Sequence, residues 1–379
     1  MNDITIDKTG WKKWRFGDVA IQTKEIVDIE NTELTRYIAG EHMISEDIHL
    51  RKWGIVGDGY LGPAFIRKFS KGDILYGSRR TYLKKVALAD FNGITANTTF
   101  VIKANKELIE PILLVHLMLS DKFTEYSVQN SRGSVNPYIN WKDIADYEFL
   151  LPPKSEQKRL AELLWAADEM IEKEKKELEK VLIEMKCIMC HFFQGENNMR
   201  PIKDFGNVFT GSTPSTKNDD YWNGEYLFLT PSEIVDTLQP LTPNRTVTEE
   251  GLNAGRRIQA GDVLVTCVGE IGRLAIANQT CCANQQINII SPHNKDVDSL
   301  YLYYNILHHR NILINNSTRS VVPILVKSTF EDILLPDLQS TIKKQFLSTL
   351  YVNEISIQKL NKQIKLSQQL KQELINKIF

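Results

Sequence analysis

The sequence repeats itself in order, and this repeat constrains the fold more than any other feature. Four stretches of the first half have counterparts in the second: FGDV (16–19) and FGNV (205–208), the segments beginning at Lys71 and at Ala260, ITANTTFVI (94–102) and CCANQQINI (281–289), and SRGSVNPYI (131–139) and STRSVVPIL (317–325). The first two pairs are displaced by 189 positions, about half of the 379 residues. Matches that keep their order over half a chain indicate a tandem duplication, so we expect two copies of one folding unit.

Each copy ends with Leu-Leu-Pro followed by a helix-forming stretch. These stretches begin LLPPKSEQKRLAELL (150–164) and LLPDLQSTIKKQFLSTL (334–350). Along both, apolar residues recur at alternating steps of four and three, the heptad pattern of a helix that packs on another helix. The apolar positions of this seam are Leu160, Leu164, Ala167, Ile171, Leu178, Val181, Met185 and Ile188 in the first helix, and Leu350, Ile357, Leu360, Ile364, Leu374 and Ile378 in the second. Polar residues interrupt the seam at Glu174, Asn353, Ser367 and Lys371.

The order of the segments predicts how the two helices pair. At 1.5 Å per residue, a helix over 155–193 would be roughly 58 Å long, and its apolar positions need cover. The first helix leads from the first globule into the second, so the second helix must run back to cover it. We therefore expect an antiparallel two-helix coiled coil that separates two globules related by a pseudo-two-fold axis. The alternative is that each helix packs on its own globule.

The globules show the pattern of mixed α/β domains. Short apolar runs bounded by glycine, such as GDILYG and GDVLVTCVG, are typical of strands, and ELIEPILLVHLMLSDKF and VDSLYLYYNILHHR are helix candidates. We therefore predict an α/β fold with an internal repeat and four segments: a first globule (1–152), a first spacer helix (153–195), a second globule (196–336) and a second spacer helix (337–379).

Composition excludes several classes of protein. Hydrophobic residues make up 42% and charged residues 25% of the chain, the balance of an ordinary globular protein. The net charge of -1 excludes a polybasic protein but not a local basic face, which is what DNA binding requires. No apolar run reaches the roughly 20 residues of a membrane span, and the N-terminus lacks a secretory signal. We therefore expect a cytoplasmic protein with five reduced cysteines.

Two segments carry a resemblance to a known family. LPPKSEQKRLAELLWAADEMIE (151–172) resembles the helical region of the DNA-specificity (S) subunits of type I restriction-modification systems, and TGSTPSTKNDDYWNGEYLFLTPSEI (210–234) is similar to the opening of their target recognition domains. The order of domain, helix, domain and helix is also that of the family. The two halves differ in places: the second helix has Leu-Gln-Ser in place of Ser-Glu-Gln, and Thr98 stands where the second half has Gln285.

The resemblance implies a non-catalytic subunit that binds double-stranded DNA with a bipartite target. Each globule would read one half of the target, and the helices would set the spacing and dock two methyltransferase (M) subunits. Cofactors would belong to the partners: S-adenosylmethionine to the M subunits, and ATP with Mg to restriction (R) subunits where these are present. A helix pair of fixed length would hold the two readers about 34–36 Å apart, one turn of DNA.

Basic and hydrogen-bonding residues gather in a few segments, which are the predicted DNA contacts. GSRRTYLKK (77–85) contains four cations and no acid, and arginines there can contact phosphates or guanine edges. The predicted DNA-binding residues are Arg79, Arg80, Tyr82, Lys84, Lys85, Arg132, Ser134, Asn136, Thr213, Lys217, Arg256, Arg257, Arg273, Thr318, Arg319 and Ser320. The alternative for the first segment is a solvated β-hairpin.

Catalytic signatures are weak throughout. NPYI (136–139) is similar to the Asn-Pro-Pro-aromatic motif of amino-methyltransferases, but it has one proline and no glycine-rich cofactor loop, so we interpret it as a turn. CIMCH (187–191) matches a haem-attachment pattern, but Ile188 continues the heptad, which favours buried or half-buried helix cysteines. The other cysteines lack a matching histidine spacing and are interpreted as core residues, with no metal site expected: Cys267, Cys281 and Cys282.

Other titratable residues also have ordinary interpretations. Glu172 and Lys175 fall on the charged face of the first helix and are interpreted as solvated surface, and His308 and His309 lack a partner carboxylate motif. No phosphate-binding GxxxxGK[ST] motif is found. A DNA-binding specificity subunit is therefore the leading hypothesis. Its competitors are an enzyme with its own methyltransferase or nuclease site, and a scaffold whose coiled coil joins proteins without reading DNA.

Overall fold

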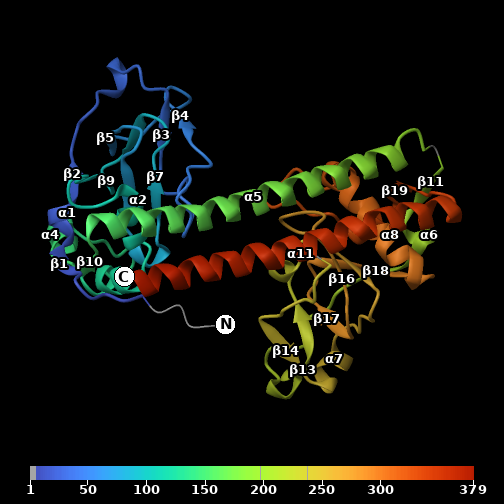
Figure 1. Ribbon diagram of the computed structural model, residues 1–379. Coiled ribbons are helices and arrows are strands. Elements are labelled where there is room, and N and C mark those ends of the chain that lie inside the picture. The colour runs from blue at the N-terminus through green and yellow to red at the C-terminus, as the bar shows by residue number, and fades with distance from the viewer. Residues whose placement is uncertain (1–5, 197, 237) are drawn as a thin grey trace. The chain divides into compact units, whose positions relative to one another are not determined.

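The structure of the chain, a computed structural model, describes residues 6–196, 198–236 and 238–379. The chain forms two compact units. The first comprises Met1–Lys176 and Leu360–Phe379, and the second comprises Glu177–Lys359. Each unit contains a globule and parts of two long helices, α5 (Lys154–Phe193) and α11 (Ser340–Ile378), drawn in green and red in Figure 1.

The first globule is built from short strands and short helices. Its elements are β1 (Lys12–Arg15), α1 (Phe16–Val19), β2 (Ala20–Thr23), β3 (Arg36–Ile38), β4 (Gly54–Ile55), β5 (Phe65–Phe69), β6 (Ile74–Gly77), β7 (Val86–Leu88), β8 (Gly93–Ala96), β9 (Thr99–Ala104), α2 (Pro111–Leu117), α3 (Asp121–Gln129), α4 (Trp141–Ala145) and β10 (Glu148–Leu151), with 3₁₀ turns at Ile29–Asn31 and Thr81–Leu83. Local sequence explains the helix starts, since Pro111 opens α2 and the Ser120 side chain caps α3.

The second globule has a matching set of elements. These are β11 (Met199–Pro201), α6 (Ile202–Phe205), β12 (Gly206–Thr210), β13 (Trp222–Leu229), β14 (Arg245–Val247), α7 (Glu249–Ala254), β15 (Val263–Thr266), β16 (Leu274–Ile276), β17 (Cys281–Ala283), β18 (Ile287–Pro292), α8 (Lys295–His308), α9 (Arg310–Asn315), α10 (Lys327–Asp332) and β19 (Leu334–Pro336), with 3₁₀ turns at Asp219–Tyr221 and Pro231–Glu233.

Sheet topology shows that the globules are copies of one fold. The four-stranded antiparallel sheets have the orders β2-β9-β6-β7 and β12-β18-β15-β16. A second sheet contains one parallel pair in each copy, β3 with β8 and β13 with β17. A two-strand ribbon, β1 with β10 and β11 with β19, leads into each long helix. The predicted mixed α/β class and internal repeat are confirmed.

The correspondence of the two copies differs from the predicted one at the turn before β9 and β18. The backbone N–H of Ser78 donates to the carbonyl of Thr98 at 3.1 Å, and that of Cys267 donates to the carbonyl of Gln286 at 2.8 Å. Thr98 therefore corresponds to Gln286, and Gln285 is an additional residue of the second turn. One inserted residue leaves the strands paired as before, because the turn absorbs it.

In the first unit, α5 and α11 run antiparallel. Asp168 and Glu174 of α5 accept hydrogen bonds from Lys371 and Gln363 of α11, each at 2.8 Å, so residue numbers rise along one helix as they fall along the other. Every predicted apolar seam position is buried or half-buried within its unit. Polar Glu174, Ser367 and Lys371 are buried among them.

The long helices also pack on the globules, so both arrangements considered from the sequence occur together. The first core contains Leu160 and Leu164 of α5 with Ile375 and Ile378 of α11, packed with residues such as Phe16. The second contains Met185 and Met189 of α5 with Phe346 and Leu350 of α11. Each unit thus takes a part of both helices, and the four-segment division of the chain stays a prediction.

Candidate nucleic-acid interface

The basic segment of the first unit follows β6 directly. Arg79 and Arg80 are exposed, and Arg80 has a φ of 48°, in the left-handed region. Neither arginine forms an ion pair with any residue that the structure describes. Because β6 is buried and paired on both sides, it fixes the position at which these two guanidinium groups leave the sheet.

The loop 131–139 lies against this segment, so two predicted DNA-binding segments form one surface. Arg80 N–H donates to the carbonyl of Pro137 at 2.7 Å, and Ile139 N–H donates to the carbonyl of Ser78 at 2.9 Å. The loop is closed by a reciprocal pair of backbone hydrogen bonds between Arg132 and Tyr138, at 2.8 and 2.9 Å. Arg132, Ser134 and Asn136 are therefore held beside Arg79 and Arg80.

The second unit repeats this arrangement with one difference: the N–H of Ile324 donates to Oγ1 of Thr318, whereas the N–H of Tyr138 donates to the backbone carbonyl of Arg132. Gly269 N–H donates to the carbonyl of Pro323, and Leu325 N–H donates to the carbonyl of Cys267, both at 2.9 Å. The loop 317–325 is closed by Thr318, whose N–H donates to the carbonyl of Ile324 at 2.9 Å. Thr318, Arg319 and Ser320 are all exposed on it. The two surfaces have one backbone frame and different side chains.

The rest of the first basic segment is less available. Lys84 is 13% exposed and its Nζ lies 2.6 Å from Asp121 and 3.1 Å from Glu46. Burial opposes the charge, but the two carboxylates outweigh burial and raise the pKa of Lys84. Lys85 donates to the carbonyl of Gly40. Lys84 is thus a structural cation, whereas Tyr82 is more than half exposed.

The remaining predicted residues of the second unit are exposed or half-buried, but most are engaged. Arg256 donates to the carbonyl of Thr210 at 2.7 Å, Arg257 pairs with Glu249, and Arg273 pairs with Glu270. Thr213 donates to the side chain of Gln285 at 2.8 Å, which ties the GSTPSTK loop to the turn before β18. Lys217 is exposed on that loop.

Several exposed residues beside these segments were not predicted. Val135 and Val321 stand at the tips of the two equivalent loops. Tyr60 is 91% exposed and directly follows Gly57 and Gly59, which both have positive φ. The glycine spacing around Tyr60 is a signal that the sequence offered. The sequence offered no such signal for the two valines, because a single apolar residue in a loop is ordinary.

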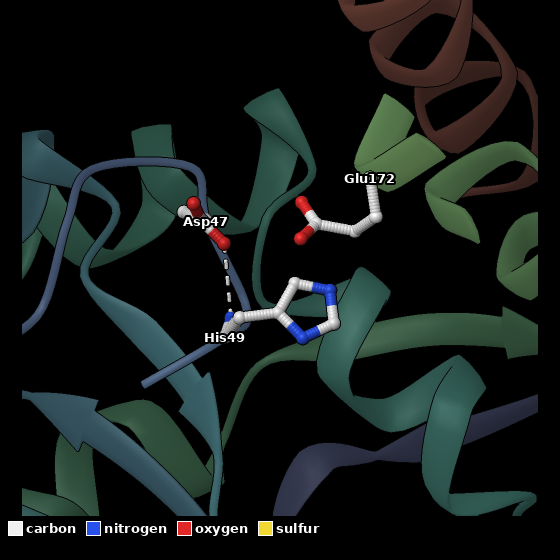
Figure 2. Close-up of side chains that lie close together, drawn as sticks. All are labelled: Asp47, His49 and Glu172. Carbon is white, nitrogen blue, oxygen red and sulfur yellow. Dashed lines mark hydrogen bonds between the residues drawn. The ribbon is translucent and has the colours of Figure 1, made fainter. Parts of the chain in front are cut away.

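Figure 2 shows Asp47, His49 and Glu172, whose ligand atoms lie within 4.8 Å of one another. Their charges are already compensated. Arg51 and Lys175 contact both carboxylates, with Lys175 Nζ at 3.3 Å from each. His49 Nε2 lies 2.5 Å from Asp168. The interpretation of Glu172 and Lys175 as free solvated surface is therefore wrong, because they join the first globule to α5 through ion pairs.

This ion-pair network shifts the pKa of its members. The hydrogen bond with Asp168 raises the pKa of His49. Burial opposes ionisation of Asp47, but hydrogen bonds from Arg51 and from the His49 backbone outweigh it and lower the pKa. Because Arg51 and Lys175 already contact the carboxylates of Asp47 and Glu172, these oxygens are not open ligand positions for a metal ion. The cluster is a structural junction.

The cysteines and histidines have no shared site in the described chain. Cys187 and Cys190 are exposed on α5, so the expectation that they are buried or half-buried is wrong. The other three cysteines are buried in the second unit, and burial raises the pKa of their thiols to about 12: Cys267, Cys281 and Cys282. Protonated thiols do not serve as metal ligands. Burial likewise lowers the pKa of His308 and His309.

In the described part of the chain, none of the helices combines the length and apolar character that crossing a membrane requires.

Comparison with known proteins gives one family. A family model described as Type I restriction modification DNA specificity domain matches residues 8–182 and again 194–374. The chain is similar to the MjaIX specificity subunit of Methanocaldococcus jannaschii, with 34% identity over 146 residues, and to the EcoDI specificity subunit of Escherichia coli, with 28% over 199 residues. These matches cover 37% and 49% of this chain but only 33% and 42% of those proteins.

A longer match is found with the HindI specificity subunit of Haemophilus influenzae, with 19% identity over 377 residues, covering 77% of this chain and 82% of that protein. Among solved structures, a type I restriction-modification assembly contains a chain with a TM-score of 0.58 at 19% identity, covering 98% of this chain and 97% of that one. The S subunit from M. genitalium gives 0.57 at 13% identity, covering 100% and 97%. At these identities the structural likeness shows the fold alone. The family resemblance expected from the sequence, that of specificity rather than catalytic components, is confirmed.

Proposed function

The chain belongs to the type I restriction-modification DNA specificity family, and we propose that it directs such a complex to a bipartite DNA target, one half read by each globule. The observation that carries this proposal is the repeated surface formed by the segment after β6 or β15 and its hydrogen-bonded loop. One frame with different side chains is what two different half-sites require, because base edges are distinguished by the groups that contact them.

The first surface is the more basic of the two. Arg79, Arg80 and Arg132 lie together on it, whereas the second surface has Arg319 with Gly269 in the place of Arg80. Arg132 lies 3.5 Å from Asp143, whereas Arg79 and Arg80 form no ion pair with the described residues. Unpaired guanidinium groups such as these two can neutralise phosphates or donate two hydrogen bonds to a guanine. We therefore propose that the first globule contributes more of the salt-dependent affinity.

The long helices supply a second surface, for protein partners. Large apolar side chains are exposed on them: Leu163, Met170, Leu366 and Leu370 in the first unit, and Leu182, Ile183, Tyr351, Val352 and Ile355 in the second. Exposed apolar side chains in this number mark an interaction site. We propose that two methyltransferase subunits dock there and that the helices set the spacing of the half-sites.

The proposal assigns no cofactor to this chain. S-adenosylmethionine belongs to the methyltransferase subunits, and ATP and Mg belong to restriction subunits where the system has them. We also propose that the whole complex is cytoplasmic.

A genome-wide map of methylated adenines, with and without this gene, tests the function. We expect one asymmetric, two-part motif with a fixed spacer to lose methylation when the gene is removed. An unchanged map in cells that express the methyltransferase partner would favour the scaffold hypothesis.

The surface is tested by Arg79→Ala and Arg80→Gly in the complex with the methyltransferase subunits. Glycine suits the left-handed backbone of residue 80, so the second change removes charge without strain. Each change should weaken target binding by roughly 10-fold and reduce the slope of log affinity against log salt by about 0.9 per lost phosphate contact. Lys106→Ala is the matched control, at an exposed position that follows the end of β9 opposite to the end paired with Gly77. An unchanged slope in both variants would remove this surface from the DNA.

A further inference from the structure

The tips of the two equivalent loops carry the same exposed apolar residue. Val135 is 88% exposed, and Val321 is fully exposed. Each is the middle residue of a nine-residue loop, 131–139 or 317–325, that is closed on itself and held by backbone hydrogen bonds to the segment after β6 or β15. An exposed valine is ordinary when it occurs once. The same side chain at the same tip in both copies indicates a contact that both copies make.

The loops separate into shared and differing positions. Ser134, Val135 and Pro137 correspond to Ser320, Val321 and Pro323. The positions around them differ: Arg132 and Thr318, Gly133 and Arg319, Asn136 and Val322, Tyr138 and Ile324. Differing side chains suit the parts of the target that differ between the half-sites. The shared valine suits a feature that both half-sites have.

The surroundings of each valine favour DNA over a protein as the partner. Neither nine-residue loop contains an acid, and each contains an arginine, although the chain as a whole has a net charge of -1. Arg132 of the first loop is paired with Asp143, but Arg80, which has no ion-pair partner among the described residues, adjoins that loop and donates its backbone N–H to Pro137. A polyanion is the partner that such a surface attracts. Valine offers no polar atom to a phosphate, so its contact must be with an apolar group of the duplex.

The apolar group that base edges display in the major groove is the C5-methyl group of thymine. We propose that Val135 and Val321 each contact a thymine methyl, one in each half of the target, at equivalent positions. This inference rests on the proposed function, and it identifies a base that the two half-sites have in common. The flanking arginines and serines then position the loop on the sugar-phosphate backbone of the DNA, while the valine contacts the thymine methyl group.

Deoxyuridine tests the contact, because it pairs as thymine does and lacks only the methyl group. Duplexes carrying the methylated target would contain deoxyuridine in place of each thymine in turn, and binding would be measured with the chain in complex with its methyltransferase subunits. We expect one sensitive thymine in each half, where loss of the methyl weakens binding about 4-fold, the effect of one buried methyl-sized group. Val135→Ala should abolish the sensitivity in one half only, and Val321→Ala in the other half only.

Two exposed valines outside the loops serve as matched controls. Val128→Ala, on α3, and Val326→Ala, before α10, should leave both sensitivities unchanged. The proposal is overturned if no thymine is sensitive, or if sensitivity persists in Val135→Ala and Val321→Ala. It is also overturned if these two variants bind the methyltransferase subunit more weakly without DNA, since the valines would then contact protein. A complex with no preferred target would instead overturn the proposed function, and this inference with it.

Discussion

At the scale of single residues, Asp168 decides how the first globule is joined to the long helices. Its carboxylate is buried and accepts from Lys371 at 2.8 Å, while the ring of His49 lies at 2.5 Å. The Asp168 carboxylate of α5 therefore contacts two other segments, the loop before β4 through His49 and α11 through Lys371. Burial opposes the ionised form, but His49 and Lys371 outweigh it and lower the pKa of Asp168.

Removing the charge of Asp168 should be costly because Lys371 is itself buried. An uncompensated buried cation destabilises a fold by several kcal/mol, so we expect Asp168→Asn to lower the unfolding free energy of the first unit by about 3 kcal/mol. Urea denaturation of the chain in its complex measures this. Asp168→Leu combined with Lys371→Met removes both charges and should recover most of the loss. Equal losses in the single and double variants would show that the pair is not the cause.

The same site predicts a pH dependence. The pKa of His49 is raised in the folded state by the hydrogen bond with Asp168, with further contributions from the charges of Glu172 and Asp47. The stability that His49⁺ contributes is therefore fully present below the unfolded pKa of about 6.5 and is lost as pH rises through the higher folded pKa. Wild-type urea midpoints should fall as the pH rises above the unfolded pKa of about 6.5, and His49→Gln should flatten this fall. A parallel fall in both proteins would assign it to other groups.

At the scale of elements, the sequence predicts most where the pattern is periodic. The two long helices follow from the heptad steps, and their observed bounds lie inside the predicted segments. The sheets were less predictable, because β3 pairs in parallel with β8 across more than 50 residues and no local pattern records such a pairing. The leucines of the two Leu-Leu-Pro elements lie in strands β10 and β19, each paired with the strand that opens its globule.

The candidate interface was predictable in composition but not in arrangement. The segments around Arg79 and Arg132 were identified from their residue types, yet the hydrogen bonds that join them are non-local. Arg80 and its counterpart Gly269 both have a positive φ. Glycine at this position indicates a turn in the second copy, whereas arginine gives no such signal in the first. Lys84 illustrates the converse: its sequence neighbours are basic, and the carboxylates that engage it come from distant segments. Charge along the sequence therefore overstates what is free to bind DNA.

At the scale of the whole molecule, both long helices contribute to the largest hydrophobic core of each unit. Ile375 near the end of α11 is fully buried in the first core, more than 200 residues after the globule that it helps to stabilise. Leu350, nearer the start of α11, is fully buried in the second core. The stability of each globule should therefore depend on a different part of one helix.

This division can be measured by hydrogen exchange along the full chain. Ile375→Ala removes a buried side chain that has no exposed surface, and we expect a loss of about 3 kcal/mol in the first unit. Exchange of protected amides in residues 6–150 should then accelerate by roughly 100-fold where it occurs through global opening of that unit. Amides of the second unit should be unaffected. Leu350→Ala should give the reverse pattern, because its side chain is equally buried in the other core. Equal acceleration of both units by either variant would mean that the two cores unfold together, and that α5 and α11 couple the globules into one cooperative structure.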